Sequence, residues 1–168
     1  MKLKILFSIL LVGATISSEG TAQPPQSPDV AEVMSEMAKY ELTKTKTESY
    51  INALDELSKM AKSDPKIFDS LKDKGDDPNV SLSTLTKIIE SNSQMLSVIK
   101  KNNLSSKDFI MIPGAFIQAQ MMTSLPPEAV KAMGAMANPA NIEFFRKEGP
   151  SLSPKFEATM KAWGDLME

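Results

Sequence analysis

The side chains of this sequence that come closest to a metal-binding pattern are paired methionines. The three pairs are Met34 and Met37, Met121 and Met122, and Met133 and Met136. Two thioethers three residues apart can share one face of a helix, and soft sulfur ligands suit Cu(I). All three pairs lie in apolar stretches, however, where methionine commonly fills irregular gaps in a core. We therefore expect core packing and keep Cu(I) binding as a minor alternative.

Two serine–lysine pairs have the spacing of a serine nucleophile with a lysine partner. They are Ser63 with Lys66 and Ser97 with Lys100. Enzymes that use such a pair also carry S-D-N and K-T-G motifs, and neither motif occurs in this chain. Because serine and lysine are frequent here, chance accounts for both pairs. We assign neither of them a catalytic role.

The composition excludes several common catalytic designs. The chain has no histidine and no cysteine, so it has no histidine-containing triad, no histidine-ligated zinc and no disulfide. An enzyme that uses carboxylates stays open, because the chain has 21 aspartates and glutamates. A general acid among them must be buried to raise its pKa, and the sequence does not show which one is. We predict no cofactor.

Two further features suggest binding chemistry. Residues 73–81 alternate polar side chains like a calcium loop, but Gly75 occupies a ligand position and Thr84 replaces the final glutamate. We expect an exposed turn there. Arg146 is the only arginine and follows Glu143 on a predicted helix. Its guanidinium group either makes a bidentate contact with a carboxylate, which lysine cannot do, or the residue is an ordinary surface residue. We favour the second interpretation.

The first 22 residues are typical of an export signal. Lys2 and Lys4 are followed by an apolar run, Ile5 to Ala14, and then by small residues that suit cleavage after Ala22. The apolar run of about ten residues is too short to span a bilayer, which takes about 20. We predict residues 1–22 as a signal peptide, no membrane span after cleavage, and an exported chain, either periplasmic or secreted.

The remaining chain is predicted to be all-α. Residues 23–28 contain three prolines and are expected to form a flexible leader. In residues 29–168 apolar side chains recur with helical spacing, and no stretch alternates as a strand does. We predict one single-domain bundle of seven to nine short-to-medium helices. The net charge of -2 and the dispersed basic residues give no clustered positive field for nucleic acid.

Helix boundaries are predicted from residues that cap or break helices. The predicted starts are Asp29, Pro65, Ser83, Asn92 or Ser93, Ser105, Pro126-Pro127, Asn138-Pro139 and Ser153-Pro154. The helix from Pro65 should reach about Asp73, and Gly149-Pro150 should end the helix before it. The threonine-rich stretch 43–47 either interrupts or merely weakens the first long helix, so its continuity is left open.

Residues 106–122 form the most apolar predicted helix. Ser105 and Asp108 have the spacing of a capping box before it, and a helix that is apolar most of the way round belongs at the centre of a bundle. Pro113 has no N–H and is expected to kink it. We favour a packing kink. The alternative is a small apolar pocket lined by Phe109, Pro113, Gly114, Phe116 and Met121.

Three fragments resemble a loose group of exported, all-helical bacterial proteins of unassigned function. They are Leu42-Thr43 followed by Tyr50, Leu104-Ser105-x-Lys107-Asp108-Phe109, and Asn138-Pro139-Ala140-Asn141 followed by Phe145. The resemblance implies a helical fold and export, and implies no activity. Our leading hypothesis is a non-enzymatic binding or interaction module with an unidentified protein partner. The alternatives are a carrier of a small apolar ligand near Pro113-Gly114, the Cu(I) binder and the carboxylate-using enzyme.

Overall fold

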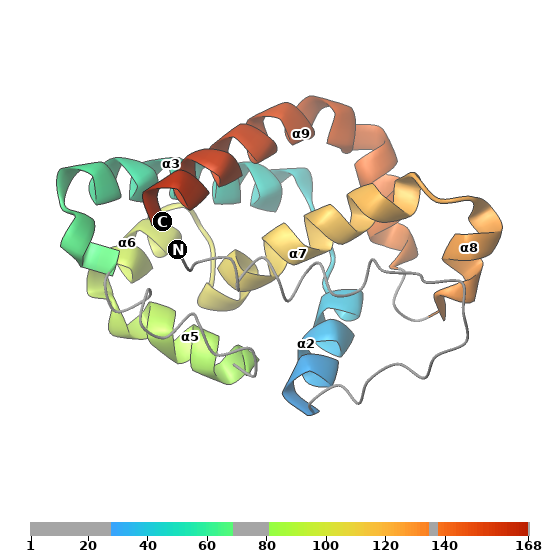
Figure 1. Ribbon diagram of the computed structural model, residues 1–168, viewed down its shortest axis with the longest axis horizontal. Coiled ribbons are helices and arrows are strands. Elements are labelled where there is room, and N and C mark those ends of the chain that lie inside the picture. The colour runs from blue at the N-terminus through green and yellow to red at the C-terminus, as the bar shows by residue number, and fades with distance from the viewer. Residues whose placement is uncertain (1–27, 69–80, 135–137, 168) are drawn as a thin grey trace.

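The computed structural model describes residues 28–68, 81–134 and 138–167, and every regular element in these ranges is helical (Figure 1). The elements are α2 (Pro28–Lys39), α3 (Lys44–Ser63), the 3-10 helix η1 (Pro65–Phe68), α5 (Leu82–Ser91), α6 (Ser93–Lys101), α7 (Ser106–Thr123), α8 (Pro127–Ala132) and α9 (Pro139–Met167). The predicted all-α class is confirmed for this part of the chain. The predicted signal peptide and leader, apart from Pro28, and the predicted turn, apart from Ser81, lie outside the described residues.

None of the helices in the described ranges has the length and apolar character needed to cross a bilayer.

Polar caps fix where four of the helices begin. The caps, each accepting a hydrogen bond from the backbone N–H three residues on, are Thr43, Ser81, Asn92 and Ser105. Ser105 and Asp108 form the full capping box that their spacing predicted. The prediction of Ser83 as a cap was wrong, because the extended backbone two residues earlier lets Ser81 take that role.

Helices α2 and α3 are two separate helices, a point on which the sequence left both possibilities open. Residues 40–43 are not helical, and Thr43 caps the new helix. Helix α2 begins at Pro28, so the prediction of Asp29 as its cap was wrong. The helix predicted from Pro65 begins there as a 3-10 turn that is described as far as Phe68.

Helix α9 continues where the sequence predicted two separate helices. It runs for 29 residues through Pro150 and Pro154, so the predicted stop at Gly149-Pro150 and the predicted start at Ser153-Pro154 were wrong. A proline inside a helix costs about 3 kcal/mol. Buried residues on both sides of the prolines, such as Gly149 and Phe156, show that packing against the rest of the molecule offsets this cost.

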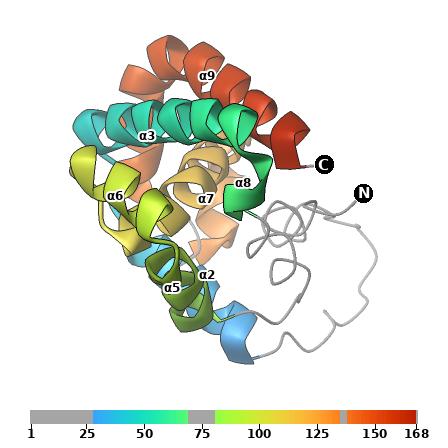
Figure 2. The same ribbon diagram turned by 90° about the vertical axis from the view of Figure 1, so that its left-hand side faces the viewer.

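Helix α7 lies at the centre of the described helices. It contacts α2, α3, α5, α6 and α9, and Figure 2 shows it surrounded by them. The helix predicted for residues 106–122 is present and continues through Pro113; the bend at Pro113 stays a prediction. Its most buried side chains include Met111, Ile112 and Phe116, which have no exposed surface.

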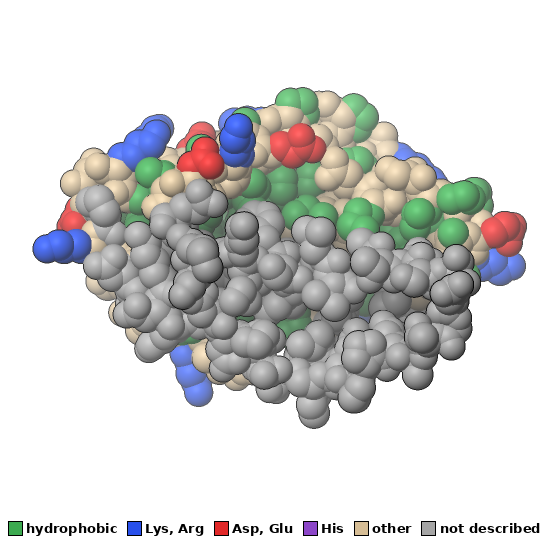
Figure 3. All heavy atoms as spheres, in the orientation of Figure 1, with side chains coloured by type: hydrophobic (Ala, Val, Ile, Leu, Met, Phe, Trp, Pro, Cys, Tyr) green, Lys and Arg blue, Asp and Glu red, His purple; other side chains and the backbone are tan. Residues whose placement is uncertain are grey.

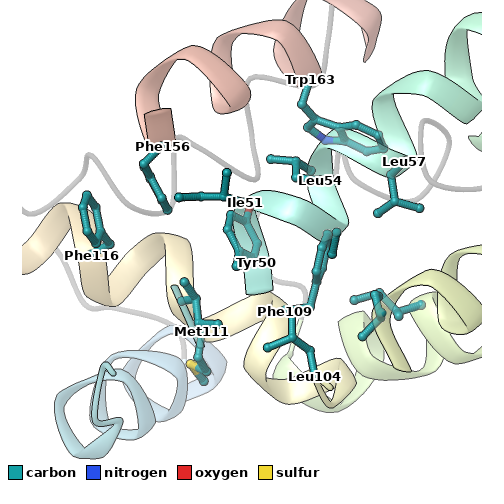
Figure 4. Close-up of a cluster of buried hydrophobic side chains, with 14 of the residues drawn as sticks. Tyr50, Ile51, Leu54, Leu57, Leu104, Phe109, Met111, Phe116, Phe156 and Trp163 are labelled. Carbon is teal, nitrogen blue, oxygen red and sulfur yellow. The ribbon is translucent and has the colours of Figure 1, made fainter. Parts of the chain in front are cut away.

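Aromatic side chains from α3, α7 and α9 connect the centre of the core (Figure 4). Tyr50 lies 5.1 Å from Phe109 and 5.7 Å from Phe156, measured between ring centroids. Phe156 stacks on Phe116 at 4.2 Å, and Phe116 meets the edge of Phe145 at 5.1 Å. Offset and edge-to-face pairs of this kind add stability beyond the burial of apolar area. These contacts hold α3, α7 and α9 together.

The single tryptophan makes a separate aromatic contact at the far end of α9. Trp163 meets the edge of Phe68 from η1, with ring centroids 5.1 Å apart. Both rings are buried. This pair holds the C-terminal turns of α9 against the end of α3, which η1 follows.

Candidate functional site

The five residues predicted to line an apolar pocket at Pro113 have different surroundings. Phe109, Gly114 and Phe116 are buried and Pro113 is half-buried, while 37% of Met121 is exposed. Phe109 and Phe116 point into the aromatic contacts of the core (Figure 4). Two surface grooves along α9 contain none of these residues in their linings. The pocket at Pro113 therefore stays a prediction, and the contacts made here are those of packing.

One methionine pair can be compared within the structure. Met122 is 5% exposed and packs with Ile142, whereas Met121 is 37% exposed, so these two sulfurs do not converge on one site. Met37, Met95 and Met111 are buried in the main core. The side chains of Met34 and Met136 lie outside the described residues. In the part of the chain that is described, no three aspartates or glutamates gather into a possible metal site.

Asp108 connects the loop between α2 and α3 to the start of α7. Its Oδ1 accepts hydrogen bonds from Tyr40 Oη and Lys46 Nζ, both at 2.8 Å. Its Oδ2 accepts from the backbone N of Ser105 at 3.0 Å and from Ser105 Oγ at 2.6 Å. Lys46 Nζ also lies 5.1 Å from the centre of the Tyr40 ring. We call Tyr40, Lys46, Ser105 and Asp108 the Asp108 junction.

The junction holds its carboxylate in the ionised form. Burial opposes ionisation of Asp108, but hydrogen bonds from Lys46, Ser105 and Tyr40 outweigh it and keep its pKa well below the usual range. The pKa of Tyr40 is raised by burial and by its bond to Asp108. Hydrogen bonds from Lys107 and Lys101 likewise lower the pKa of Glu36 and of Glu56. A general acid needs a raised pKa, so none of these three carboxyl groups is prepared for that role.

Two asparagines at the start of α9 hold the same loop from the other side. Asn141 is 2% exposed; its Oδ1 accepts from Leu42 N at 2.8 Å and its Nδ2 donates to Tyr40 O at 2.8 Å. Asn138 Nδ2 donates to Ala38 O at 2.9 Å and to Tyr40 O at 3.1 Å. These bonds satisfy backbone groups that have no helical partner.

The three fragments that carried the resemblance meet around this loop. Leu42 contacts Asn141 through its backbone, and Tyr50 packs against Phe109. Asp108 accepts a hydrogen bond from Tyr40, which lies two residues before the first fragment. The fragments therefore share a structural role: they lock the α2–α3 loop between the starts of α7 and α9.

Two grooves of about 340 Å³ each run along α9. The α3–α9 groove is lined by Lys44, Glu48, Ile51, Asn52, Ser151, Leu152 and Lys155. The α8–α9 groove is lined by Pro127, Val130, Lys131, Gly134, Pro139, Ile142 and Arg146. Hydrophobic side chains reach the α8 end of the molecule, where charged groups flank them (Figure 3). The two grooves have the same size and differ in their charges.

In the α3–α9 groove, acidic side chains accompany the lysines of the lining. Lys44 Nζ lies 3.1 Å from Glu148 Oε2, and Glu48 also lines the groove beside Lys155. The hydrogen bond to Glu148 raises the pKa of Lys44, so this lysine already has a fixed anionic partner. A ligand anion would have to compete with that carboxylate.

The described lining of the α8–α9 groove carries two positive charges and no acidic residue. Lys131 and Arg146 are exposed and form no ion pair with any residue of the described ranges. The predicted neighbour Glu143 is not within ion-pair distance of Arg146. Buried Ile142 and half-buried Val130 supply an apolar floor. This groove can place an anionic group beside an apolar one.

Sequence reasoning found part of these sites. The capping-box spacing identified Ser105 and Asp108. Arg146 was noticed because it is the only arginine in the sequence. Tyr40 and Lys46 were missed because they lie 68 and 62 residues from Asp108, and no local pattern connects them. The lining of the α8–α9 groove was missed because it depends on how two helices lie against each other.

Comparison of the chain with protein-family models, with curated proteins and with solved structures finds no match. Its function is therefore inferred from its own side chains.

Proposed function

We propose that the protein is an exported, non-enzymatic binding module and that the α8–α9 groove is its binding surface. The observation that supports this most directly is that the cations Lys131 and Arg146 line the groove with an apolar floor, and that none of the described lining residues is acidic. The scaffold we propose is a single-domain bundle in which Pro113 bends the central helix α7. In this scheme the packed core carries the fold, and the groove at its edge carries the binding.

The described lining of the groove supports binding. Arginine and lysine attract and orient an anion, while Val130 and Ile142 shelter an apolar group from water. Among the residues that the structure describes, the lining contains no serine, threonine, tyrosine or carboxylate that could act as nucleophile or base. A lysine nucleophile is activated by burial, whereas Lys131 is exposed.

Site-specific photo-crosslinking tests this function. A benzoylphenylalanine residue would replace Ala132 on α8, and the matched control would replace Ala162 at the other end of α9; both alanines are exposed. In the producing cells we expect position 132 alone to form one adduct of discrete mass. Identical adducts from both positions, or no adduct from either, would contradict the proposal. So would turnover by the purified protein in a panel of esterase, glycosidase and peptidase substrates.

A further inference from the structure

We infer that the α8–α9 groove binds a polypeptide segment in which an apolar side chain stands next to a carboxylate. This inference rests on the proposed binding role and adds the chemistry of the partner. It follows from three properties of the groove: its two cations form no ion pair with a described residue, its floor is apolar, and it is open.

The charge of the groove selects an anion. Arg146 and Lys131 line it together without an acidic neighbour in the lining, whereas the α3–α9 groove of the same volume already holds Glu48 and a lysine paired with Glu148. The planar guanidinium of Arg146 can donate two parallel hydrogen bonds to a carboxylate, a geometry that lysine cannot reproduce. Among the two grooves, this one is complementary to a carboxylate.

The floor of the groove selects an apolar side chain beside that carboxylate. Pro139, Ile142 and Arg146 are spaced three and four residues apart, so they share one face of α9. Ile142 is only 6% exposed and packs on Met122, with Val130 half-buried next to this pair. Gly134 has a φ of 52° and leaves the space where a side chain would stand empty. An apolar group of one or two residues fits above this floor.

The openness of the groove favours a polypeptide over a free fatty acid. Five of the lining residues, Pro127, Lys131, Gly134, Pro139 and Arg146, are exposed. Small-molecule sites usually enclose most of the ligand surface, and an acyl chain lying here would keep much of its length in water. A peptide segment needs to bury only the side chains that enter the groove, because the rest of its chain is covered by its own fold or solvated.

Titration of the ¹⁵N-labelled protein with four probes tests the inference. The first probe is acetyl-Ser-Leu-Glu-Leu-Ser-amide, and the second is the same peptide with glutamine in place of glutamate. The third, acetyl-Ser-Leu-Gln-Leu with a free C-terminus, moves the carboxylate to the end of the chain. The fourth is dodecanoate below its micellar concentration. We expect at least one carboxylate peptide to shift the amide signals of Val130, Gly134 and Ile142.

Comparison of the probes identifies the source of the carboxylate. Binding of the glutamate peptide alone assigns it to an acidic side chain, and binding of the free-ended peptide alone assigns it to a chain terminus. The uncharged glutamine peptide should bind about tenfold more weakly than the better of the two. Equal binding of the glutamine peptide would overturn the inference, and so would shifts caused by dodecanoate only.

Substitutions then separate the groove from the rest of the surface. We expect Arg146→Lys to weaken peptide binding about fivefold and Arg146→Gln about tenfold, because the bidentate contact and then the charge are lost. Lys155→Gln, an exposed lysine on the same helix, is the matched control and should change nothing. An equal loss with Lys155→Gln would overturn the inference. If no peptide binds at millimolar concentration, this chemistry is wrong, while a specific crosslink from position 132 would still support the binding role.

Discussion

The two ends of α9 are held to the protein in different ways. The C-terminal half packs its apolar face on α3, η1 and α7, with Leu152, Phe156 and Trp163 all buried in the main core. The first turns are held by hydrogen bonds between the side-chain amides of Asn138 and Asn141 and the backbone at the end of α2 and in the α2–α3 loop. Of their apolar side chains, Ile142 belongs to a small separate cluster with Met122, while Phe144 and Phe145 pack against the main core. Neighbouring α8 has no buried residue.

Under the proposed function, one helix serves both stability and binding. Dense packing leaves no room for a ligand, because protein interiors are filled nearly as tightly as organic crystals. At the polar end, hydrogen bonds fix the position of the helix while leaving its outer face uncovered. We expect the end with fewer fully buried side chains to contribute less to the folding free energy, and its outer face is the surface that the proposed function assigns to a partner.

Truncation of the two apolar clusters should give the largest contrast. Phe156→Ala removes a buried ring stacked on Phe116 and should lower the free energy of unfolding by about 3–5 kcal/mol. Ile142→Ala in the small cluster should cost about 2 kcal/mol, at the low end for such a change, because the site is near the surface and can relax. Equilibrium urea unfolding measures both values, and equal losses would mean that the two ends do not differ.

Acid should weaken the polar end through the Asp108 junction. Asp108→Asn should lower the free energy of unfolding by about 2 kcal/mol at pH 7, since hydrogen bonds to a charged group are lost. The pKa of Asp108 is lowered by folding, so its contribution is present above the ordinary pKa of 3.8 and is lost as the pH falls below it. The difference between the two proteins should therefore shrink on acidification from pH 5 to pH 2. A constant difference across urea titrations in this range would refute the role given to this carboxylate.

Two glycines on α9 offer a smaller and oppositely signed test. A Cβ at Gly149 would lie 2.8 Å from ring atoms of Phe145, which itself packs on Phe116, so Gly149→Ala should destabilise the protein by about 1–2 kcal/mol. A Cβ at Gly164 would meet nothing within 4 Å, and Gly164→Ala should stabilise it by about 0.5–1 kcal/mol through helix propensity. Thermal unfolding followed by circular dichroism distinguishes these outcomes; stabilisation by both substitutions would show that the Phe145 ring moves freely.

Arg146→Gln should have the smallest effect on stability. The side chain is exposed and makes no ion pair with a described residue, so the free energy of unfolding should change by less than about 0.5 kcal/mol. Urea unfolding beside the unsubstituted protein measures this. A larger loss would assign Arg146 to the fold and weaken its assignment to the groove.

Local signals predicted the features that depend on neighbouring residues. Helical spacing of apolar residues indicated the all-α class, and the Ser105–Asp108 spacing located the start of α7. Both depend on residues within one or two turns. Gly149-Pro150 misled for the same reason: the pair is a stop signal locally, whereas the helix is maintained by burial against α3 and α7. At position 149 a glycine avoids a steric clash with the Phe145 ring.

Contacts between residues that are far apart in the sequence could not be predicted from such local patterns. Nothing in the pattern around Asp108 points to Tyr40 or Lys46, and nothing around Leu42 points to Asn141, which lies 99 residues away. Arg146 was noticed only because it is the sole arginine. The apolar floor beside it required the placement of α8 on α9, which the periodicity of either helix alone does not give.

The position of Trp163 has a practical consequence for spectroscopy. It is the only tryptophan in the chain, it is buried against Phe68, and along α9 it lies about 25 Å from Arg146 at the rise of an α-helix. Its emission will therefore follow loss of the native state but stay silent when a peptide occupies the groove. Intrinsic fluorescence can thus score stability in the presence of any probe, while occupancy must be followed by a label near α8.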